Sequence, residues 1–386
     1  MRAWLEREWQ RLGGGALVFL PFALAFRAVS ALRRALYRAR ILPSWRSPVP
    51  VVVIGNITAG GTGKTPLVIA VVEALARSGR RPGVISRGYG RVPPTDADPR
   101  GVVRVLPGVA TPEYFGDEPV LIARRTGVPV YLSPDRPAAA RALLAAHPEV
   151  DVLVSDDGLQ HYALARDVEI AVVDGERGFG NGLPLPSGPL REPVSRLREV
   201  DAAVVNGGND DRVPAPRQFA MRLAGERFVS FSGEDLSPGE FALAVRGRRV
   251  AAVAGIGNPA RFFAHLLRLG VAADRHPFPD HHHFQPAELR LPGAELVVMT
   301  EKDAVKCAAF ADARMWFLRV EAALPPEFDA FLLERLAERK RPWWTPSSSR
   351  SSSAPSARAP SSTAGSPTNS SAAPTASPFP SGTTSR

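Results

Sequence analysis

Residues 55–66 read GNITAGGTGKTP and follow the apolar run VVVI directly. The standard phosphate-binding loop has the pattern G-x-x-x-x-G-K-[ST] and lies between a strand and a helix. The last three positions fit: Gly63, Lys64 and Thr65. Thr58 stands where the pattern has its first glycine, so the loop is a variant of the standard form.

The remaining glycines of this segment still suit an anion. Gly60 and Gly61 allow backbone N–H groups to turn inward, and a helix predicted from Pro66 adds its positive N-terminal end. Lys64 is then expected to reach the outer phosphates of a nucleotide, and Thr65 to offer its hydroxyl to Mg²⁺. The alternative is a glycine-rich turn with an incidental lysine. We predict that the nucleotide phosphates bind along Thr58, Ala59, Gly60, Gly61, Thr62, Gly63, Lys64 and Thr65.

Two adjacent acids, Asp156 and Asp157, end the apolar run of VDVLVSDDGLQH. A carboxylate at the end of a strand beside a phosphate loop is where such folds hold Mg²⁺, directly or through water. A capping role accounts for one of the two acids. We predict both as metal ligands.

A second acidic pair, Asp117 and Glu118, precedes a predicted helix in FGDEPVLIA. An aspartate at a helix N-terminus is an ordinary cap, so residue chemistry alone leaves capping and function equally open. The segment SRGYGR at 86–91 is either an anion-binding loop or a surface turn.

Three adjacent histidines, His281, His282 and His283, follow Asp280. Adjacent side chains in regular structure do not converge on one metal ion, which disfavours zinc. One histidine held by an acid and acting as a proton acceptor is the better interpretation. Farther along, TEKDAVKC supplies Lys302 and Lys306, which either bind an anion or are simply solvated.

The elements that must position these residues alternate between strand and helix. We predict strands at 51–54, 82–86, 128–133, 151–157, 169–175 and 201–208. Helices are predicted at 66–78, 118–125 and 137–147. Alternation with short links indicates an α/β fold, a phosphate-loop (P-loop) NTPase-like, doubly wound and mainly parallel sheet. A second, smaller α/β unit begins near residue 246, with strands near 250 and at 294–300, and a closing helix at 327–340.

Charge is concentrated at the ends of the 386-residue chain, whose formal net charge is +10. Residues 1–46 carry nine Arg against two Glu, or +7, and residues 345–386 add three Arg, so the middle is neutral. This distribution argues against a nucleic-acid binder, and no obligate protein partner is evident. The single cysteine excludes an intrachain disulfide and fits a reducing compartment.

The N-terminal segment combines an uncharged stretch, 12–26, with a basic and apolar stretch, 27–42. The first is shorter than the roughly 20 residues that span a bilayer. The second resembles an amphipathic helix lying on an anionic membrane surface. A helix packed on the protein's own core and a cleaved signal peptide are the other two interpretations.

We therefore predict four regions. They are an N-terminal membrane-associated helix (1–46), a P-loop core (47–240), a smaller α/β domain (241–342) and a disordered tail rich in Ser, Pro and Ala (343–386).

The ordered set of motifs resembles the tetraacyldisaccharide 4′-kinase family of Gram-negative lipid A biosynthesis. It comprises GNITAGGTGKTP, SRGYGR, GDEP, SDDGLQH, NGLPLPSGPLREP, GIGNPARFF, FPDHHHF and TEKDAVKC. The resemblance runs to about residue 340. It implies ATP and Mg²⁺ as cofactors and a lipid disaccharide 1-phosphate as acceptor of the γ-phosphate at its 4′-hydroxyl. It also implies docking at the cytoplasmic face of the inner membrane.

The resemblance also assigns roles. The acid of GDEP, which helps to deprotonate the acceptor, corresponds to Asp117, and Glu118 beside it is predicted as a further Mg²⁺ ligand. The acids of the DDG motif correspond to Asp156 and Asp157. The catalytic histidine corresponds to His281, with a shift to His282 left open, and together with Asp117 it would take the proton of the sugar hydroxyl. Lys64 is the catalytic cation of the loop.

Two rival functions share part of this pattern. A membrane-associated nucleotide-dependent switch or targeting protein would also use the loop and the N-terminal segment. Against it, Ala59 stands where dimerising ATPase switches carry a signature lysine, and VVNGGND at 204–210 lacks the lysine of a guanine-reading motif. A soluble small-molecule kinase would leave residues 12–40 unexplained.

Overall fold

The computed structural model describes residues 8–9, 13–88, 101–106 and 111–338. The predicted tail at 343–386 lies outside the described residues, as do Tyr89 and Arg91 of the SRGYGR segment. The α-helices are α2 (Gly14–Val18), α3 (Leu20–Arg38), α4 (Lys64–Arg77), α5 (Pro112–Phe115), α6 (Asp117–Thr126), α7 (Arg136–Ala146), α8 (Pro238–Ala244), α9 (Pro259–Arg268), α10 (Glu301–Cys307) and α11 (Pro326–Ala337). Short 3₁₀ helices are η1 (Val194–Glu199) and η2 (Pro286–Leu289).

The strands are β1 (Val51–Gly55), β2 (Pro82–Ser86), β3 (Val103–Val105), β4 (Val130–Leu132), β5 (Val152–Asp156), β6 (Val168–Asp174), β7 (Ala202–Asn206), β8 (Gln218–Ser230), β9 (Asp235–Leu236), β10 (Val250–Ala254), β11 (Asp274–Pro277), β12 (Leu296–Thr300) and β13 (Met315–Ala323). They form one sheet in the order β11-β10-β12-β13-β8-β7-β6-β1-β5-β2-β4-β3, with β9 beside β8. Within the described residues, neighbouring strands are parallel except at β3–β4, β8–β9 and β8–β13. The prediction of a mainly parallel α/β sheet is confirmed.

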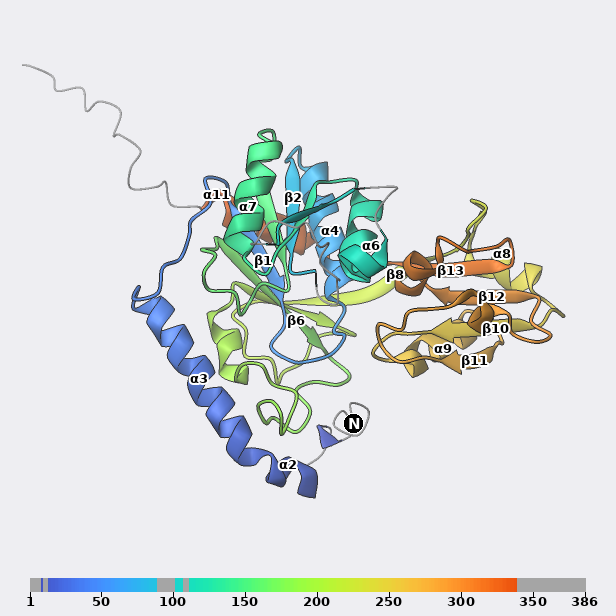
Figure 1. Cartoon of the computed structure of the whole chain (residues 1–386), viewed down its shortest axis with the longest axis horizontal. Coiled ribbons are helices and arrows are strands. Elements are labelled where there is room, and N and C mark those ends of the chain that lie inside the picture. Colours follow the sequence, from blue (N-terminus) through green and yellow to red (C-terminus); the bar gives the residue numbers. More distant parts are fainter. Residues whose placement is uncertain (1–7, 10–12, 89–100, 107–110, 339–386) are drawn as a thin grey trace, which may run out of the picture. The chain divides into compact units, whose positions relative to one another are not determined.

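Helices cover both faces of the sheet around β1, which is buried along its whole length. Alternate residues of a strand face opposite sides. Val52 and Ile54 accordingly pack in one cluster with α4, α6 and α11, whereas Val51 and Val53 pack in another with α7. A strand buried on both faces needs the continuous apolar run that the sequence shows. Figure 1 shows these helices about the sheet.

The long strands β8 and β13 connect two lobes of the sheet (Figure 1). Residues 218–221 of β8 pair with β7, and residues 222–230 pair with β13. We call residues 51–221 together with α11 the first lobe, and residues 226–323 the second lobe. The closing helix α11 packs through Phe328 and Phe331 in the core of the first lobe. On sequence alone, this helix is predicted in the smaller α/β domain. The exact domain boundaries stay a prediction.

The carboxyl ends of five adjacent parallel strands meet at one edge of the first lobe. The phosphate-loop segment follows β1, and the last residues of the neighbouring strands β2, β5, β6 and β7 are polar: Ser86, Asp156, Asp174 and Asn206. Ligands of open α/β sheets bind at this edge. The topology alone therefore brings the loop and the predicted acids together.

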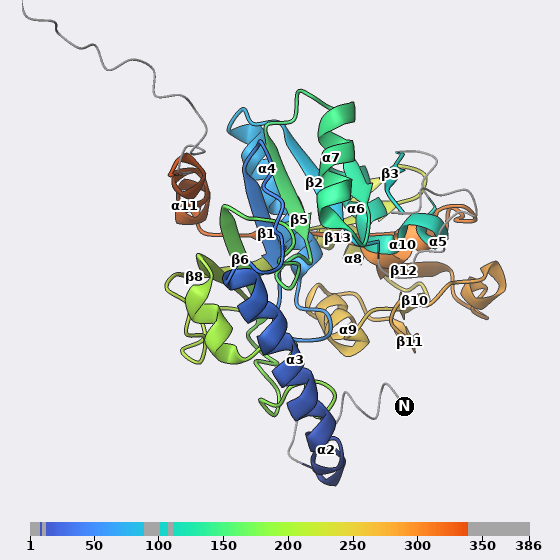
Figure 2. The same cartoon turned by 60° about the vertical axis from the view of Figure 1, so that its left-hand side comes forward.

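The N-terminal helices α2 and α3 lie outside the layers that cover the sheet (Figures 1 and 2). Arg34 and Arg38 of α3 contact Glu199 of η1. Several large apolar side chains of this segment are exposed, among them Leu17, Val18, Phe22, Val29 and Leu32. None of the helices in the described residues is long and apolar enough to span a bilayer.

Candidate active site

The phosphate-loop segment has the backbone shape that an anion cradle needs. Gly60 and Gly63 have positive φ values of 101° and 92°, which favour glycine. Gly63 is the residue before α4, so Lys64 and Thr65 form the first turn of that helix. Free N–H groups and the helix dipole both favour a negative ligand at this point.

Neighbouring side chains hold the loop from beneath. Asn56 Nδ2 donates to Thr62 Oγ1 at 3.2 Å, and Asn206 Nδ2 donates to the Thr62 carbonyl at 3.3 Å. Arg177 donates to the carbonyls of Ala59 and Gly61, each at 3.3 Å. These bonds occupy carbonyl oxygens of the loop, and the Ala59 N–H donates to the Pro189 carbonyl at 2.7 Å.

Gly61 and Gly63, on either side of Thr62, allow a matched test of how the loop packs. A Cβ at Gly63 would lie 2.7 Å from Asn206 Nδ2, at a positive φ. At Gly61 a Cβ would meet no atom within 4 Å. We expect Gly63→Ala to lower the free energy of unfolding by about 1–3 kcal/mol, and Gly61→Ala by less than about 0.5 kcal/mol. Urea denaturation measures both; equal losses would contradict the described loop.

Asp156 is buried at the end of β5 with an incomplete set of partners. Its Oδ2 accepts a hydrogen bond from Ser86 Oγ at 2.8 Å, whereas its Oδ1 is buried without a hydrogen-bond partner among the described residues. Burial, with the charges of Glu118 and Asp157 added, raises the pKa of Asp156 to about 6. A buried carboxylate oxygen that lacks a donor is a group that a bound cation would satisfy.

Asp157 differs from its neighbour because cations surround it. Arg191 Nη1 lies 3.0 Å from both carboxylate oxygens, and Lys64 Nζ lies 3.6 Å from Oδ1. Burial raises the pKa of Asp157, but Lys64 and Arg191 outweigh it and lower the pKa to about 2. The pKa values of the two adjacent acids are thus shifted in opposite directions, as expected in a functional site where neighbouring acids have different roles.

Asp117 and His281 come together although 164 positions separate them. The Nδ1 of His281 lies 3.1 Å from Asp117 Oδ2, and its Nε2 lies 3.7 Å from Asp280 Oδ2. Burial raises the pKa of Asp117, but the hydrogen bond with His281 and the charge of Lys302 lower it well below its ordinary value. Asp117 is therefore an ionised acceptor at neutral pH, and His281 is the more exposed member of the pair.

His282 has a different environment from His281. Its Nε2 lies 3.0 Å from Glu288 Oε2, and its ring packs between Phe278 and Phe284 at centroid distances of 4.8 and 5.0 Å. None of these contacts involves Asp117. The geometry favours His281 over His282 as the partner of the acid, and the assignment stays a prediction.

Both lysines of the TEKDAVKC segment are engaged with carboxylates rather than solvated. Lys306 Nζ lies 2.6 Å from Asp303, which in turn accepts the Gly255 N–H at 3.0 Å, so this pair holds the loop after β10. Lys302 Nζ lies 3.0 Å from Glu118 Oε1, the fourth predicted metal ligand. The sequence left an anion-binding role open for both lysines, and the structure gives each an acidic partner.

The second lobe contacts the first lobe at the phosphate loop and at the end of β6. A Cβ built on Gly257, in the loop before α9, would lie 3.6 Å from the Gly61 backbone nitrogen. Arg261 of α9 lies 3.6 Å from Asp174 and 3.7 Å from Glu176, both in the first lobe. The lobes are thus in contact around the predicted site.

Several residues of this site were not predicted from the sequence: Ser86, Arg136, Arg177, Arg191, Asn206 and Arg261. Arg136 is buried and donates to the carbonyls of Ser133 and Asp156 at 3.0 and 2.8 Å, which fixes the turn that carries the acids. For Ser86 and Asn206 the signal was available, because both are polar residues within the last three positions of predicted strands of one parallel sheet. The arginines had no such signal in an arginine-rich chain.

The sheet order, the glycine-lined loop between β1 and α4, and the polar strand ends at one edge define a phosphate-loop protein of the nucleotide-binding class.

Comparison with known proteins gives the particular family. The sequence pattern of the family described as tetraacyldisaccharide-1-P 4′-kinase matches residues 15–337. The tetraacyldisaccharide 4′-kinase of Methylobacillus flagellatus is 47% identical over 338 residues, covering 87% of this chain and 95% of that protein. That of Azoarcus sp. is 49% identical over 336 residues, covering 86% and 96%. The chain belongs to the tetraacyldisaccharide 4′-kinase family, as its motifs predicted.

A solved structure supports the fold as well. LpxK from Aquifex aeolicus in complex with ATP aligns with a TM-score of 0.65 and 26% identity, covering 83% of this chain and 99% of that one. The predicted α/β class is therefore confirmed by a relative as well as by the sheet itself.

Proposed function

We propose that the chain transfers the γ-phosphate of ATP to the 4′-hydroxyl of a tetraacyldisaccharide 1-phosphate in lipid A biosynthesis. Family membership and the ATP complex of the aligned LpxK support the reaction and the nucleotide. The observation that carries the proposal is the meeting of Asp117 and His281 beside a phosphate loop. A switch protein needs the phosphate loop, but its function does not require a proton acceptor formed by one residue from each lobe.

The nucleotide phosphates lie on the segment from Thr58 to Thr65 in this proposal. Lys64 neutralises the outer phosphates, and its 3.6 Å contact with Asp157 keeps it at the mouth of the loop. Phosphoryl transfer depends mainly on positioning and charge neutralisation, so a fixed cation at this point has a large effect.

Mg²⁺ is the cation that the acids fit best. Among the described residues no group of three or more His, Cys, Asp or Glu side chains could hold a metal ion alone. Mg²⁺ in phosphoryl-transfer sites takes one or two carboxylates and completes its shell with phosphates and water. The residues that would hold it are Thr65, Asp156, Asp157 and Glu118. The buried, unpartnered Oδ1 of Asp156 fits this role. Bound there, Mg²⁺ would offset charge on the transferred phosphoryl group.

The pair of Asp117 and His281 accepts the proton of the 4′-hydroxyl. The hydroxyl oxygen then forms a bond to the γ-phosphorus, the bond from that phosphorus to the β–γ bridging oxygen breaks, and ADP leaves. Because Asp117 is ionised and buried while His281 is more exposed, the pair acts as a unit in which the acid orients the ring. The two lobes must be closed for this pair to exist.

Product analysis tests the proposed reaction directly. The purified chain is incubated with γ-labelled ATP and the lipid disaccharide 1-phosphate, and products are separated by thin-layer chromatography. We expect a bisphosphorylated lipid that carries the label at the 4′ position. Hydrolysis of ATP without a labelled lipid would instead favour the switch interpretation.

We also propose that α2 and α3 dock the enzyme on the cytoplasmic face of the inner membrane. An acylated acceptor leaves a bilayer at a cost of about 0.8 kcal/mol for each buried CH₂, so the enzyme must come to it. The exposed apolar side chains of this segment support the proposal, since Leu17, Phe22 and Val29 are 64–66% exposed. Arginines nearby suit anionic headgroups.

Replacing Leu17, Phe22 and Val29 together with serine should release the chain from vesicles. We expect the vesicle-bound fraction in sedimentation to fall about 10-fold, because the apolar area available for insertion is removed. Leu243→Ser is the matched control, since Leu243 on α8 is 71% exposed but lies in the second lobe. Equal binding by both variants would contradict docking through α2 and α3.

A further inference from the structure

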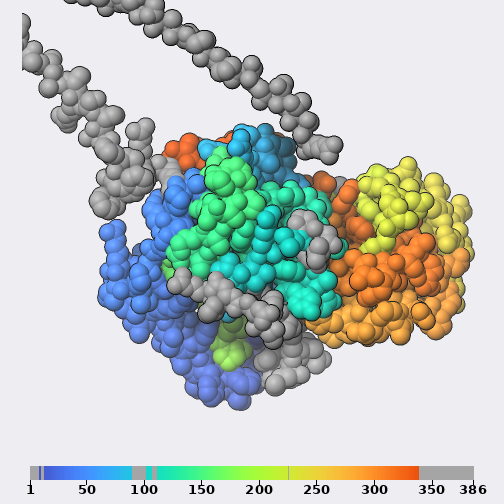
Figure 3. All heavy atoms as spheres, turned by 45° about the horizontal axis from the view of Figure 1, so that its top comes forward, coloured from blue at the N-terminus to red at the C-terminus, as the bar shows by residue number. Residues whose placement is uncertain are grey.

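Helix α10 of the second lobe holds α6 of the first lobe at both ends through consecutive residues. Lys302 Nζ contacts Glu118 Oε1 at 3.0 Å in the first turn of α6, and Glu301 Oε2 contacts Arg125 Nη1 at 2.8 Å in its last turn. The space-filling view shows the teal segment that includes α6 beside the yellow and orange second lobe (Figure 3). These two ion pairs join the same two helices, but their surroundings differ.

Lys302 lies among carboxylates of the candidate site. Besides Glu118, its Nζ lies 3.6 Å from Asp117 Oδ2 and 4.0 Å from Asp280 Oδ1. Asp280 and Asp117 are also the two acids beside His281, at 3.7 and 3.1 Å. One largely buried ammonium therefore offsets the charge of three acids and connects both partners of the histidine. Buried charges of one sign repel strongly unless a cation lies between them.

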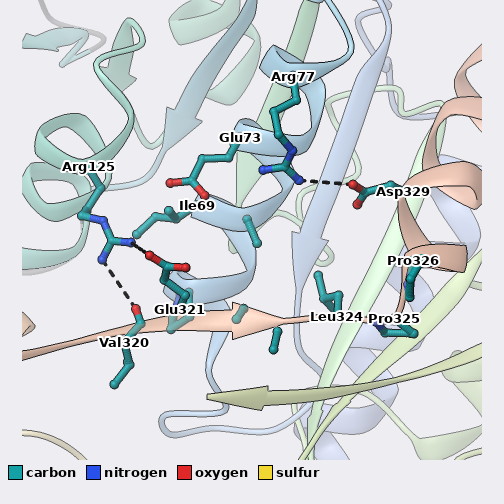
Figure 4. Close-up of a pocket in the computed structure, with 14 residues that line it drawn as sticks. Ile69, Glu73, Arg77, Arg125, Val320, Glu321, Leu324, Pro325, Pro326 and Asp329 are labelled. Carbon is teal, nitrogen blue, oxygen red and sulfur yellow. Dashed lines mark hydrogen bonds and ion pairs between the residues drawn. The ribbon is translucent and has the colours of Figure 1, made fainter. Parts of the chain in front are cut away.

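Arg125, at the other end of α6, has no contact with the site. It contacts Glu301, lies 3.8 Å from Glu321, and donates to the Val320 carbonyl at 3.5 Å. It lines a cavity of about 250 Å³ between α4, β13 and the start of α11, which contains none of the predicted site residues (Figure 4). Arg125 therefore joins the lobes as Lys302 does, without touching the proton-accepting pair.

We propose that Lys302 is a positioning residue for phosphoryl transfer: its ammonium holds Asp117 and Glu118 in place across the lobes and orients the Asp117–His281 pair. The inference rests on the proposed function. The sequence left two roles open for Lys302, anion binding and a solvated surface position. The positioning role proposed here differs from both. Without this ammonium, the repulsion between Asp117, Glu118 and Asp280 is relieved by their moving apart, and His281 loses its fixed acceptor.

The test compares two cation deletions at the two ends of α6. We expect Lys302→Met to lower kcat by about 10- to 100-fold with the KM for ATP within about 2-fold of wild type, because proton acceptance is impaired while the loop and the two acids after β5, Asp156 and Asp157, still hold the nucleotide and its Mg²⁺. Arg125→Met breaks the ion pair with Glu301 at the other end of α6. We expect this variant to keep kcat within about 2-fold of wild type after correction for the folded fraction. Thermal unfolding of both variants reports the shared loss of stability.

Two further variants keep the test decisive. Lys302→Gln retains a donor without charge and replaces Lys302→Met if methionine prevents folding; the same loss of kcat is expected. Lys302→Arg retains the charge and should recover most of kcat. Equal kcat values for the Lys302 and Arg125 deletions would overturn the positioning role. If wild-type protein transfers no phosphate to the lipid, the proposed function itself fails, and this inference fails with it.

Discussion

Replacing Lys64 with alanine is expected to lower the rate of phosphoryl transfer about 10³-fold, because it removes the fixed cation that faces the outer phosphates. In the structure Lys64 opens α4 and its ammonium lies 3.6 Å from Asp157. Its loss therefore also leaves Asp157 with Arg191 as its remaining close cation. Initial rates with labelled ATP and the lipid acceptor measure the effect, while vesicle binding should be unchanged.

Lys64→Arg is the informative control for this position. The chain carries only four lysines among 48 basic residues, so a lysine here indicates that a compact ammonium is needed. We expect the arginine variant to lose most of the activity too, since its longer planar group does not fit between the loop and Asp157. Full turnover by Lys64→Ala would exclude Lys64 from the transfer step.

Asp117→Asn is expected to reduce kcat by about 10²- to 10⁴-fold, the contribution typical of a general base. The substitution keeps the shape of the side chain but removes the negative charge that Lys302 and His281 stabilise. Binding of ATP should be nearly unchanged, because the loop residues are untouched. Stopped-flow binding of a fluorescent nucleotide and steady-state kinetics separate the two quantities.

The histidine pair provides the matched control for Asp117. His281→Ala is expected to resemble Asp117→Asn, because both remove one half of the same hydrogen bond. His282→Ala breaks the contact with Glu288 instead and should affect stability more than kcat. A larger loss of kcat at His282 than at His281 would move the catalytic role to the neighbouring ring.

Much of the fold could be predicted because most strands of the first lobe carry their own signal; the three-residue strand β3 was not predicted. The run at 51–54 is continuous and apolar, and the run at 82–86 is apolar until Ser86, as strands buried on both faces require; they correspond to β1 and β2. The helix predicted at 66–78 corresponds to α4, whose apolar positions recur with helical spacing. Local pattern and tertiary environment agree in these elements.

The long pair β8 and β13 could not be predicted from local pattern. Residues 218–230 mix arginine and glutamate with apolar residues, because one strand serves two lobes and changes partner from β7 to β13 along its length. Its regularity comes from pairing with distant residues rather than from its own periodicity. For the same reason α11 could be predicted as a helix but not placed on the first lobe.

The candidate site shows a similar division. The loop and Asp156 could be predicted because strand ends of a parallel sheet meet at one edge. The pairing of Asp117 with His281 came only through resemblance, since a helix cap explains the acid equally well and no local signal connects residues 164 positions apart. The role of Lys302 depends on contacts between lobes, which spacing along the chain does not encode.

A crystal structure with a non-hydrolysable ATP analogue and Mg²⁺ tests the central claim most directly. We predict that the triphosphate lies along residues 58–65, with its γ-phosphate facing the Asp117–His281 pair and Mg²⁺ beside Asp156. A triphosphate bound elsewhere, with these acids facing no phosphate, would contradict the proposed active site.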